Sequence, residues 1–242
     1  MYKRILFLLA LILLPNIAFA QGISINIGEN ASSTNSMLQL LAALTILSVA
    51  PGILLMVTGF TRIIVILAIL RNAIGLQQTP SNMIMVSLAL FITFFVMKPT
   101  FEEAWDNGIN PYMMERITEE RAIEKTIEPF KKFMYSQVDQ TSLRALESIA
   151  EVKEPSTSYE DVDLISLMPA FLISELKRAF EIGFLIFVPF LVIDMVIAAI
   201  LMSMGMMMMS PMIVSLPFKI IFFVLIDGWA LVTTSIVRGF GV

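Results

Sequence analysis

Four charged residues lie inside long apolar stretches of the sequence, and they are the first candidates for chemistry. They are Arg62, Asp194, Lys219 and Asp227. A charge at the centre of a bilayer costs roughly 2.5–3.5 kcal/mol on insertion scales, so such side chains face protein or water and usually pair. By sign, Lys219 can pair with Glu175 or Asp194, and Arg62 can pair with Asp194 or Asp227. Pairing within one chain and pairing between the subunits of a ring are both open at this stage.

A row of methionines connects two apolar stretches, Ile182–Leu201 and Met212–Val237. We name this connection, residues 204–210, the methionine loop. Its four consecutive methionines are Met206, Met207, Met208 and Met209. Gly205 and Pro211 punctuate the connection, which predicts a helical hairpin. Tight turns usually carry small polar residues, whereas methionine is apolar, flexible and able to fill irregular gaps. We therefore expect several copies of the loop to meet and seal a pore; a loop that rests on lipid or packs in a core is the alternative.

Several classes of chemistry are excluded by composition. The chain contains no Cys and no His, which removes disulfides, thiolate nucleophiles, Ser-His-Asp triads and ordinary zinc sites. No phosphate-binding GxxxxGK[ST] motif occurs either. We expect no catalytic residue, no cofactor and no metal, so energy for any transport has to come from partners.

Three alternatives to a pore-forming subunit remain open. An ion-coupled transporter would use Asp194 and Asp227 as proton or cation carriers. An intramembrane hydrolase would need either Ser174 with Lys177 or the same two aspartates, and this is the weakest alternative. A scaffold without a pore of its own is the third.

The overall composition is that of an all-α polytopic membrane protein. The 242 residues are 57% hydrophobic and 15% charged, with mean hydropathy +0.85, whereas soluble domains are about 25% charged. The net charge is −4, and 17 of the 20 acidic residues lie in residues 100–182 against nine of the 16 basic ones. An acidic segment therefore separates two apolar halves, and nothing is basic enough to suggest nucleic acid binding.

The N-terminal residues 1–20 have the pattern of a cleavable signal peptide. Lys3 and Arg4 precede an apolar stretch, and Ala18-Phe19-Ala20 has the small-x-small pattern of a cleavage site. An uncleaved first anchor is the alternative. Residues 21–37 are small and polar, which predicts a flexible lead-in.

Residues 38–99 predict a first apolar helical hairpin. We expect a helix broken near Pro51, a turn at residues 75–80, and a second helix that ends at Lys98-Pro99.

Residues 100–166 predict an acidic helical insert, and residues 167–242 a second apolar hairpin. Within the insert, a helix is expected from Asn110-Pro111 to a break at Glu128-Pro129. Apolar stripes follow at helical spacing, namely Phe130, Phe133, Met134 and Val138, then Leu143, Leu146 and Ile149. Further helix breaks are expected at Pro189 and Pro217.

Two sets of long motifs lie in the two apolar halves of the chain. The first set is Leu44-Thr45-Ile46-Leu47-Ser48-Val49-Ala50-Pro51, Thr58-Gly59-Phe60-Thr61-Arg62-Ile63, Leu70-Arg71-Asn72-Ala73-Ile74-Gly75 and Gln77-Gln78-Thr79-Pro80. The second set is Ser174-Glu175-Leu176-Lys177, Ile182-Gly183-Phe184-Leu185-Ile186-Phe187, Asp194, Met204-Gly205-Met206-Met207-Met208, Leu216-Pro217-Phe218-Lys219 and Leu225-Ile226-Asp227-Gly228-Trp229. With these motifs the chain resembles the FliP family of flagellar type III export-gate proteins, of which the injectisome proteins are homologues. The resemblance covers about residues 38–237.

The resemblance implies a helical, funnel-like oligomer at the core of the export gate. Several copies of this chain would join FliQ and FliR homologues, work with FlhA and FlhB homologues, and pass unfolded flagellar proteins. The assembly would lie in the bacterial inner membrane within the flagellar basal body, in contact with lipid and with much of the chain, including the lead-in and the insert, on the periplasmic side. The family's methionine gasket maps onto Met206–Met209, and its salt bridge between subunits maps onto Glu175 and Lys219.

Overall fold

The structure, a computed structural model, describes residues 33–150, 156, 158–206 and 208–241. Every regular element in that part of the chain is a helix, which confirms the predicted all-α class. The expected signal peptide and most of the expected lead-in lie outside the described residues. The chain divides into two units, Met1–Val49 and Ala50–Val242, and the packing described below is that of the second unit.

Helix α2 spans Ser33–Met56 and continues through Pro51. Because the helix begins at Ser33, the last residues of the expected lead-in are helical. Because it continues through residue 51, the expected break near Pro51 is wrong. The helical path is interrupted instead at residues 57–59. A Cβ atom added to Gly59 would lie 2.7 Å from the ring of Phe240. The break therefore falls beside a glycine that is packed against Phe240 and not at the proline.

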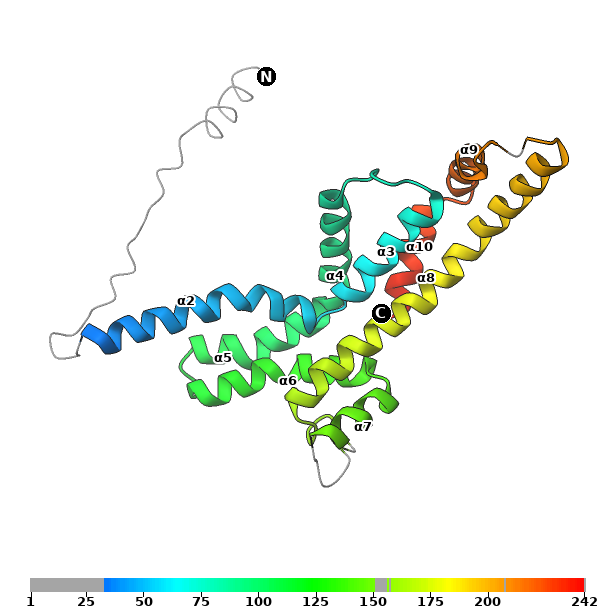
Figure 1. The fold of residues 1–242 in the computed structure, drawn as a ribbon. Coiled ribbons are helices and arrows are strands. Elements are labelled where there is room, and N and C mark those ends of the chain that lie inside the picture. The colour runs from blue at the N-terminus through cyan, green and yellow to red at the C-terminus, as the bar shows by residue number, and fades with distance from the viewer. Residues whose placement is uncertain (1–32, 151–155, 157, 207, 242) are drawn as a thin grey trace, which may run out of the picture. The chain divides into compact units, whose positions relative to one another are not determined.

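Helix α3 (Phe60–Ile74) is the central element of the second unit, and Figure 1 shows it alongside α8. Its inward face recurs every three or four residues, as expected for an amphipathic helix: Ile63, Ile66, Leu67, Leu70, Ala73 and Ile74 are buried. The helix ends at Gly75, whose φ of 92° is a left-handed conformation that glycine adopts at low cost. The turn predicted at residues 75–80 follows.

Helix α4 (Asn82–Ala104) continues through Pro99 into a π-helical segment, η1 (Trp105–Ile109), and then into α5 (Asn110–Met113). The expected stop at Lys98-Pro99 is therefore wrong. Residues on both sides of the proline pack inward, namely Val96, Met97, Thr100 and Ala104. This packing holds the helix together across the one hydrogen bond that the proline removes.

Helices α6 (Glu119–Gln137) and α7 (Gln140–Ile149) follow in the acidic segment. The helix expected to run on from Asn110-Pro111 ends at Met113 instead, because the chain turns at residues 114–118, where Glu115 has a left-handed φ of 56°. The expected break at Glu128-Pro129 is wrong, because α6 runs through it while packing on α4, η1 and α8. Of the predicted apolar stripes, Met134, Val138 and Leu143 are buried in one cluster with residues of α8, while Ile149 is exposed.

The second hairpin consists of α8 (Leu164–Ser203), α9 (Pro211–Leu225) and α10 (Gly228–Arg238). The methionine loop connects α8 with α9, as predicted. The expected breaks at Pro189 and Pro217 are wrong, because both prolines lie inside continuous helices. The bend in this half of the chain falls between α9 and α10 instead, at an angle of 63°.

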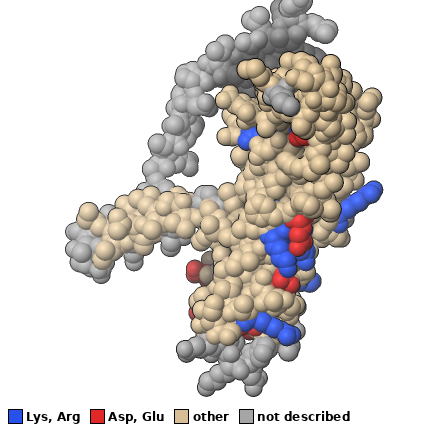
Figure 2. Space-filling model, turned by 45° about the vertical axis from the view of Figure 1, so that its right-hand side comes forward, with Lys and Arg blue, Asp and Glu red and all other residues tan. Residues whose placement is uncertain are grey.

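Two helical segments are long and apolar enough to cross a membrane, Asn82–Met113 and Leu164–Ser203. Two bent pairs also qualify if each is one broken span, namely α2 with α3 and α9 with α10. Helices α4 and α8 run across the expected segment boundaries at residues 99–100 and 166–167, so composition changes there while the helix continues. On the face drawn in Figure 2, charged side chains gather over part of the surface and leave wide uncharged areas.

Candidate functional site

Arg62 of α3 and Glu175 of α8 form a buried ion pair, with exposed fractions of 1% and 0%. The Nε of Arg62 donates to Oε2 of Glu175 at 2.9 Å, and Nη2 donates to Oε1. This two-bond arrangement is the strong geometry of a guanidinium with a carboxylate. The expectation that Arg62 meets Asp194 or Asp227 is therefore wrong.

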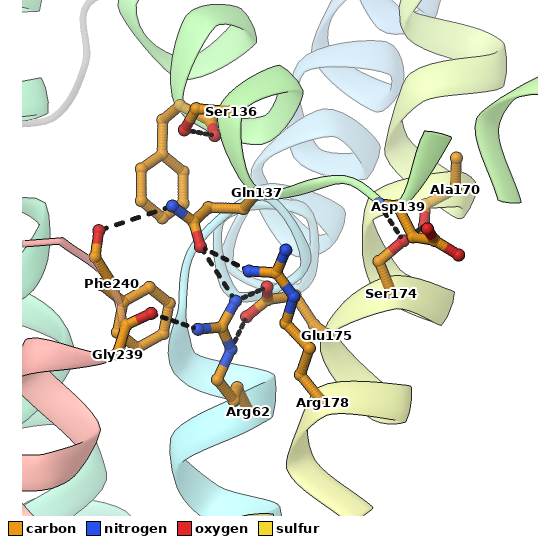
Figure 3. Close-up of polar contacts among 11 residues, drawn as sticks. Arg62, Ser136, Gln137, Asp139, Ala170, Ser174, Glu175, Arg178, Gly239 and Phe240 are labelled. Carbon is orange, nitrogen blue, oxygen red and sulfur yellow. Dashed lines mark hydrogen bonds and ion pairs between the residues drawn. The ribbon is translucent and has the colours of Figure 1, made fainter. Parts of the chain in front are cut away.

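Three further groups complete what we name the Arg62 cluster: Gln137, Gly239 and Phe240. Figure 3 shows Arg62 and Arg178 both pointing toward the side-chain amide of Gln137, whose oxygen accepts from each at 3.1 Å. The carbonyl of Gly239 accepts from Nη1 of Arg62 at 3.2 Å, and the ring of Phe240 lies 3.9 Å from the guanidinium carbon. Each of the three guanidinium nitrogens thus has an acceptor, and the cluster ties α3, α6, α8 and the segment after α10 together.

Lys219 of α9 is the centre of a second group, which we name the Lys219 cluster. Its Nζ donates to Oδ2 of Asp194 at 2.6 Å and to the carbonyl of Ala73 at 3.1 Å. The hydroxyl of Ser215 donates to Oδ1 of Asp194 at 2.5 Å. The pairing of Lys219 with Asp194 was one of the two predicted alternatives. Because Ala73 lies in the last turn of α3, the ammonium also faces the negative end of that helix dipole.

The predicted salt bridge between Glu175 and Lys219 of neighbouring subunits stays a prediction. Within the chain, Glu175 is bound to Arg62 and Lys219 is bound to Asp194. A bridge between subunits therefore requires each residue either to bind a second partner or to exchange the one it has.

Asp227 is exposed on the chain, so its expected burial is wrong at the level of one subunit. It lies in the turn between α9 and α10 with φ 50° and ψ 52°, a left-handed conformation that Asp tolerates better than most residues. A Cβ atom on the next residue, Gly228, would lie 2.1 Å from the ring of Phe223. Turn geometry therefore accounts for the Asp-Gly pair in the sequence.

Ser174 and Lys177, the candidate hydrolase pair, have structural roles. The Ser174 hydroxyl donates to the carbonyl of Ala170 at 2.7 Å and accepts from the backbone N–H of Asp139 at 2.9 Å. Lys177 lies 3.5 Å from the Asp139 carboxylate instead of the serine. Among the described residues, no three Asp or Glu side chains converge as a metal site.

The methionine loop begins with a helix-ending turn of defined geometry. Gly205 has φ 73°, its N–H donates to the carbonyl of Met202 at 3.1 Å, and the N–H of Met206 donates to the carbonyl of Leu201 at 3.0 Å. These bonds form a Schellman motif, which satisfies the last carbonyls of α8. The backbone at the base of the loop is therefore specified, whatever the side chains above it contact.

The side chains of the methionine loop are exposed on the single chain. Met206 and Met209 are 37% and 45% exposed, and Met208 is fully exposed. Met207 lies outside the described residues. Apolar side chains gathered on a turn and exposed together indicate a surface that another molecule covers.

Side chains in or beside the two clusters that were not anticipated from the sequence include Gln137, Arg178, Ser215 and Phe240. For Ser215 and Gln137, the spacing in the sequence could have indicated the role. Ser215 precedes Lys219 by four residues, so both lie on one face of a helix. Gln137 follows Phe133 by four residues, which places it on the apolar stripe of α6, where an uncharged polar residue requires a partner.

Comparison with known proteins gives consistent matches along the chain. The sequence model described as the FliP family matches residues 43–236. The Flagellar biosynthetic protein FliP of Caulobacter vibrioides is 50% identical over 233 residues, which cover 96% of this chain and 87% of that protein. The protein of the same name from Rhizobium meliloti is 49% identical, and the match covers 97% of this chain and 97% of that protein. The one from Bacillus subtilis is 48% identical, and the match covers 88% of this chain and 94% of that protein. The chain belongs to the FliP family.

Proposed function

We propose that this chain is a core channel-forming subunit of the flagellar type III protein export gate. Several copies enclose a pore in the inner membrane through which unfolded flagellar proteins pass, and the methionine loop seals that pore when it is closed. The observation that carries the proposal is the set of exposed methionine side chains on a turn with a specified backbone.

Family membership supports a role in flagellar export as a membrane component and not as an enzyme. The long apolar helices support placement in a membrane. The exposed side chains of α8 and α9 include many large apolar ones that a lone chain leaves uncovered, such as Phe184, Leu185, Met195, Ile213 and Val224. These surfaces suit contact with lipid and with other subunits.

The Lys219 cluster gives the methionine loop a stable base. Lys219 lies eight residues after Pro211, the first residue of α9, which is roughly 12 Å along a helix. Its bonds to Asp194 and Ala73 fasten α9 to α8 and α3. A flexible apolar tip on a fastened hairpin is suited to a seal that has to open and close at the same place.

The sealing step follows from the properties of methionine. Its unbranched side chain changes rotamer readily and packs against irregular surfaces, so a ring of such side chains can part around a passing chain and close again. Parting exposes apolar surface, and the apolar side chains of the passing chain replace part of the lost contact.

The partners we propose are further copies of this chain, FliQ and FliR homologues within the gate, and FlhA and FlhB homologues beside it. Exported flagellar proteins are the cargo, and membrane lipid surrounds the assembly. Much of the chain, including the acidic segment, then lies on the periplasmic side within the flagellar basal body.

Replacement of Met206, Met207, Met208 and Met209 by glycine tests the seal. Ion leak is measured in cells that express the assembled gate, with the intact assembly verified by native electrophoresis. We expect a clear rise in leak, because glycine removes every side chain that closes the opening. Met83→Ser is the matched control, since Met83 is an exposed methionine in the first turn of α4. An intact quadruple variant with wild-type leak would count against the seal.

The ion-coupled transporter is less well supported. It requires Asp194 and Asp227 to load and release an ion in one path. Asp194 is bound to Lys219 and Ser215, whereas Asp227 lies exposed in the turn between α9 and α10.

A further inference from the structure

We propose that Gly239 and Phe240, the two residues after α10, form a latch that fastens α10 over the buried Arg62–Glu175 pair. When the latch is released, α10 swings about the turn at Asp227 and Gly228. This conformational role goes beyond the proposed function, because it concerns neither the methionine loop nor the pore.

The latch is made of specific contacts with Arg62 and Gln137 (Figure 3). The Gly239 carbonyl accepts from Arg62 at 3.2 Å, and the Phe240 carbonyl accepts from Nε2 of Gln137 at 3.4 Å. The ring of Phe240 lies 3.9 Å from the guanidinium carbon, a cation–π distance. Gly239 therefore accepts a hydrogen bond from a buried charge, and the next residue, Phe240, makes a cation–π contact with the same charge.

The seat of the latch is shaped for an aromatic ring. Gly59 leaves the space that the Phe240 ring occupies, since an added Cβ atom would lie 2.7 Å from one ring carbon and 2.8 Å from another. The ring of Phe133 stacks nearby, with the two centroids 6.3 Å apart and the planes at 23°. As a result, Phe240 is buried although it follows the last helix of the chain.

The other end of α10 has the geometry of a hinge. Helix α9 ends at Leu225 and α10 begins at Gly228, with a 63° bend between them. Asp227 at this turn has φ 50° and ψ 52°, so the direction of α10 depends on the backbone dihedrals of one or two residues. Elements joined by such a turn move as units when their far end is released.

Packing between α10 and the helices beneath it is incomplete, so the latch contributes much of what keeps α10 in place. A partly open apolar pocket of about 350 Å³ lies between α3, α8, α9 and α10, and its lining includes Leu70, Phe190, Phe222, Leu231, Val232 and Ile236. Side chains beside such a space lack part of the contact that a filled core provides. Release of the latch would widen this pocket and admit water to Arg62 and Glu175.

Distance measurement by double electron–electron resonance tests the latch on the full-length chain. The chain has no cysteine, so Ser136→Cys and Arg238→Cys, both at exposed positions, are the only labelling sites. Labelled chain is diluted with unlabelled chain so that only pairs within one molecule are measured. Gly59→Ala is the latch variant, because its methyl group displaces the Phe240 ring without altering Arg62 or Glu175. Gly52→Ala is the matched control, since nothing lies within 4 Å of a Cβ atom there.

We expect one narrow distance distribution in the background chain and in Gly52→Ala, and a broader distribution shifted to longer distance in Gly59→Ala. Phe240→Leu, which keeps an apolar side chain but removes the ring, is expected to give the same shift. It decides the question if Gly59→Ala does not fold. An unchanged distribution in a folded latch variant would overturn the proposal.

Discussion

Two ion pairs hold helices together, one fully buried and one with a buried lysine and a partly exposed aspartate. Arg62 and Glu175 are 113 residues apart, and Asp194 and Lys219 are 25 residues apart. Removal of a charge from water is unfavourable, so a buried pair stabilises only when every donor and acceptor is satisfied. The Arg62 cluster comes close to this condition, because four hydrogen bonds use four of the five guanidinium N–H groups and reach both oxygens of Glu175.

The first prediction concerns a broken pair. Arg62→Leu leaves Glu175 buried without its cation, and we expect it to lower the free energy of unfolding by about 3–5 kcal/mol. Arg62→Leu combined with Glu175→Leu is expected to lower the free energy of unfolding clearly less, because no uncompensated charge remains. Thermal unfolding in detergent measures both. Lys98→Ala is the control, since the pair of Lys98 with Glu102 is exposed and worth at most about 1 kcal/mol. Equal losses in the single and double variants would contradict the argument.

The second prediction separates a structural role of Asp194 from a role in ion transport. Asp194→Asn leaves Lys219 buried without a counterion, and we expect reduced stability and reduced flagellar export. Asp194→Leu combined with Lys219→Met removes both charges and is expected to restore much of the export, measured as secreted flagellar protein. If Asp194 carries ions, the double variant will export no better than the single one.

Residue types indicated which side chains need partners but left the choice of partner open. Lys219 with Asp194 was among the predicted pairs because both lie in apolar stretches and carry opposite charges. The partner of Arg62 was missed because Glu175 was placed outside the apolar core, in a charged stretch before it. Glu175 is buried because α8 extends back to Leu164, and the rotation of one helix against another is not encoded in local spacing.

At the level of elements, the existence of the helices was predictable and their ends were not. Pro51, Pro99, Pro129, Pro189 and Pro217 were each expected to end or break a helix, and each lies inside one. A proline in a helix interior costs about 3 kcal/mol or more. Burial of a single Leu or Phe side chain contributes about 1.5–3 kcal/mol, so a few packed residues on either side outweigh the break.

The third prediction concerns the turn at the base of the methionine loop. Gly205→Ala is expected to lower the free energy of unfolding by about 1 kcal/mol, because a left-handed φ is unfavourable for alanine. Gly205→Asn is expected to lower the free energy of unfolding less than Gly205→Ala does, since asparagine tolerates this conformation. Chemical unfolding measures both variants. Nothing lies within 4 Å of a Cβ atom added at residue 205, so the loss reports backbone strain and not a steric clash. A larger loss in Gly205→Asn than in Gly205→Ala would argue against a Schellman turn.

For the molecule as a whole, composition predicted a helical membrane protein, and the family match and the apolar helices agree with it. The surface of the single chain explains why the rest could not be predicted. Large apolar side chains remain exposed on α4, α8 and α9 and in the methionine loop. Hydropathy does not distinguish a side chain that faces lipid from one that faces another subunit, because both surroundings are apolar.

Native mass spectrometry of the chain co-expressed with FliQ and FliR homologues tests whether copies of this chain together form the gate. We expect one discrete complex that contains several copies of this chain, because the methionine loops can close a pore only when they meet. A chain that stays monomeric, alone and with these partners, would rule out the proposed gate, since no ring would then exist for the methionines to seal.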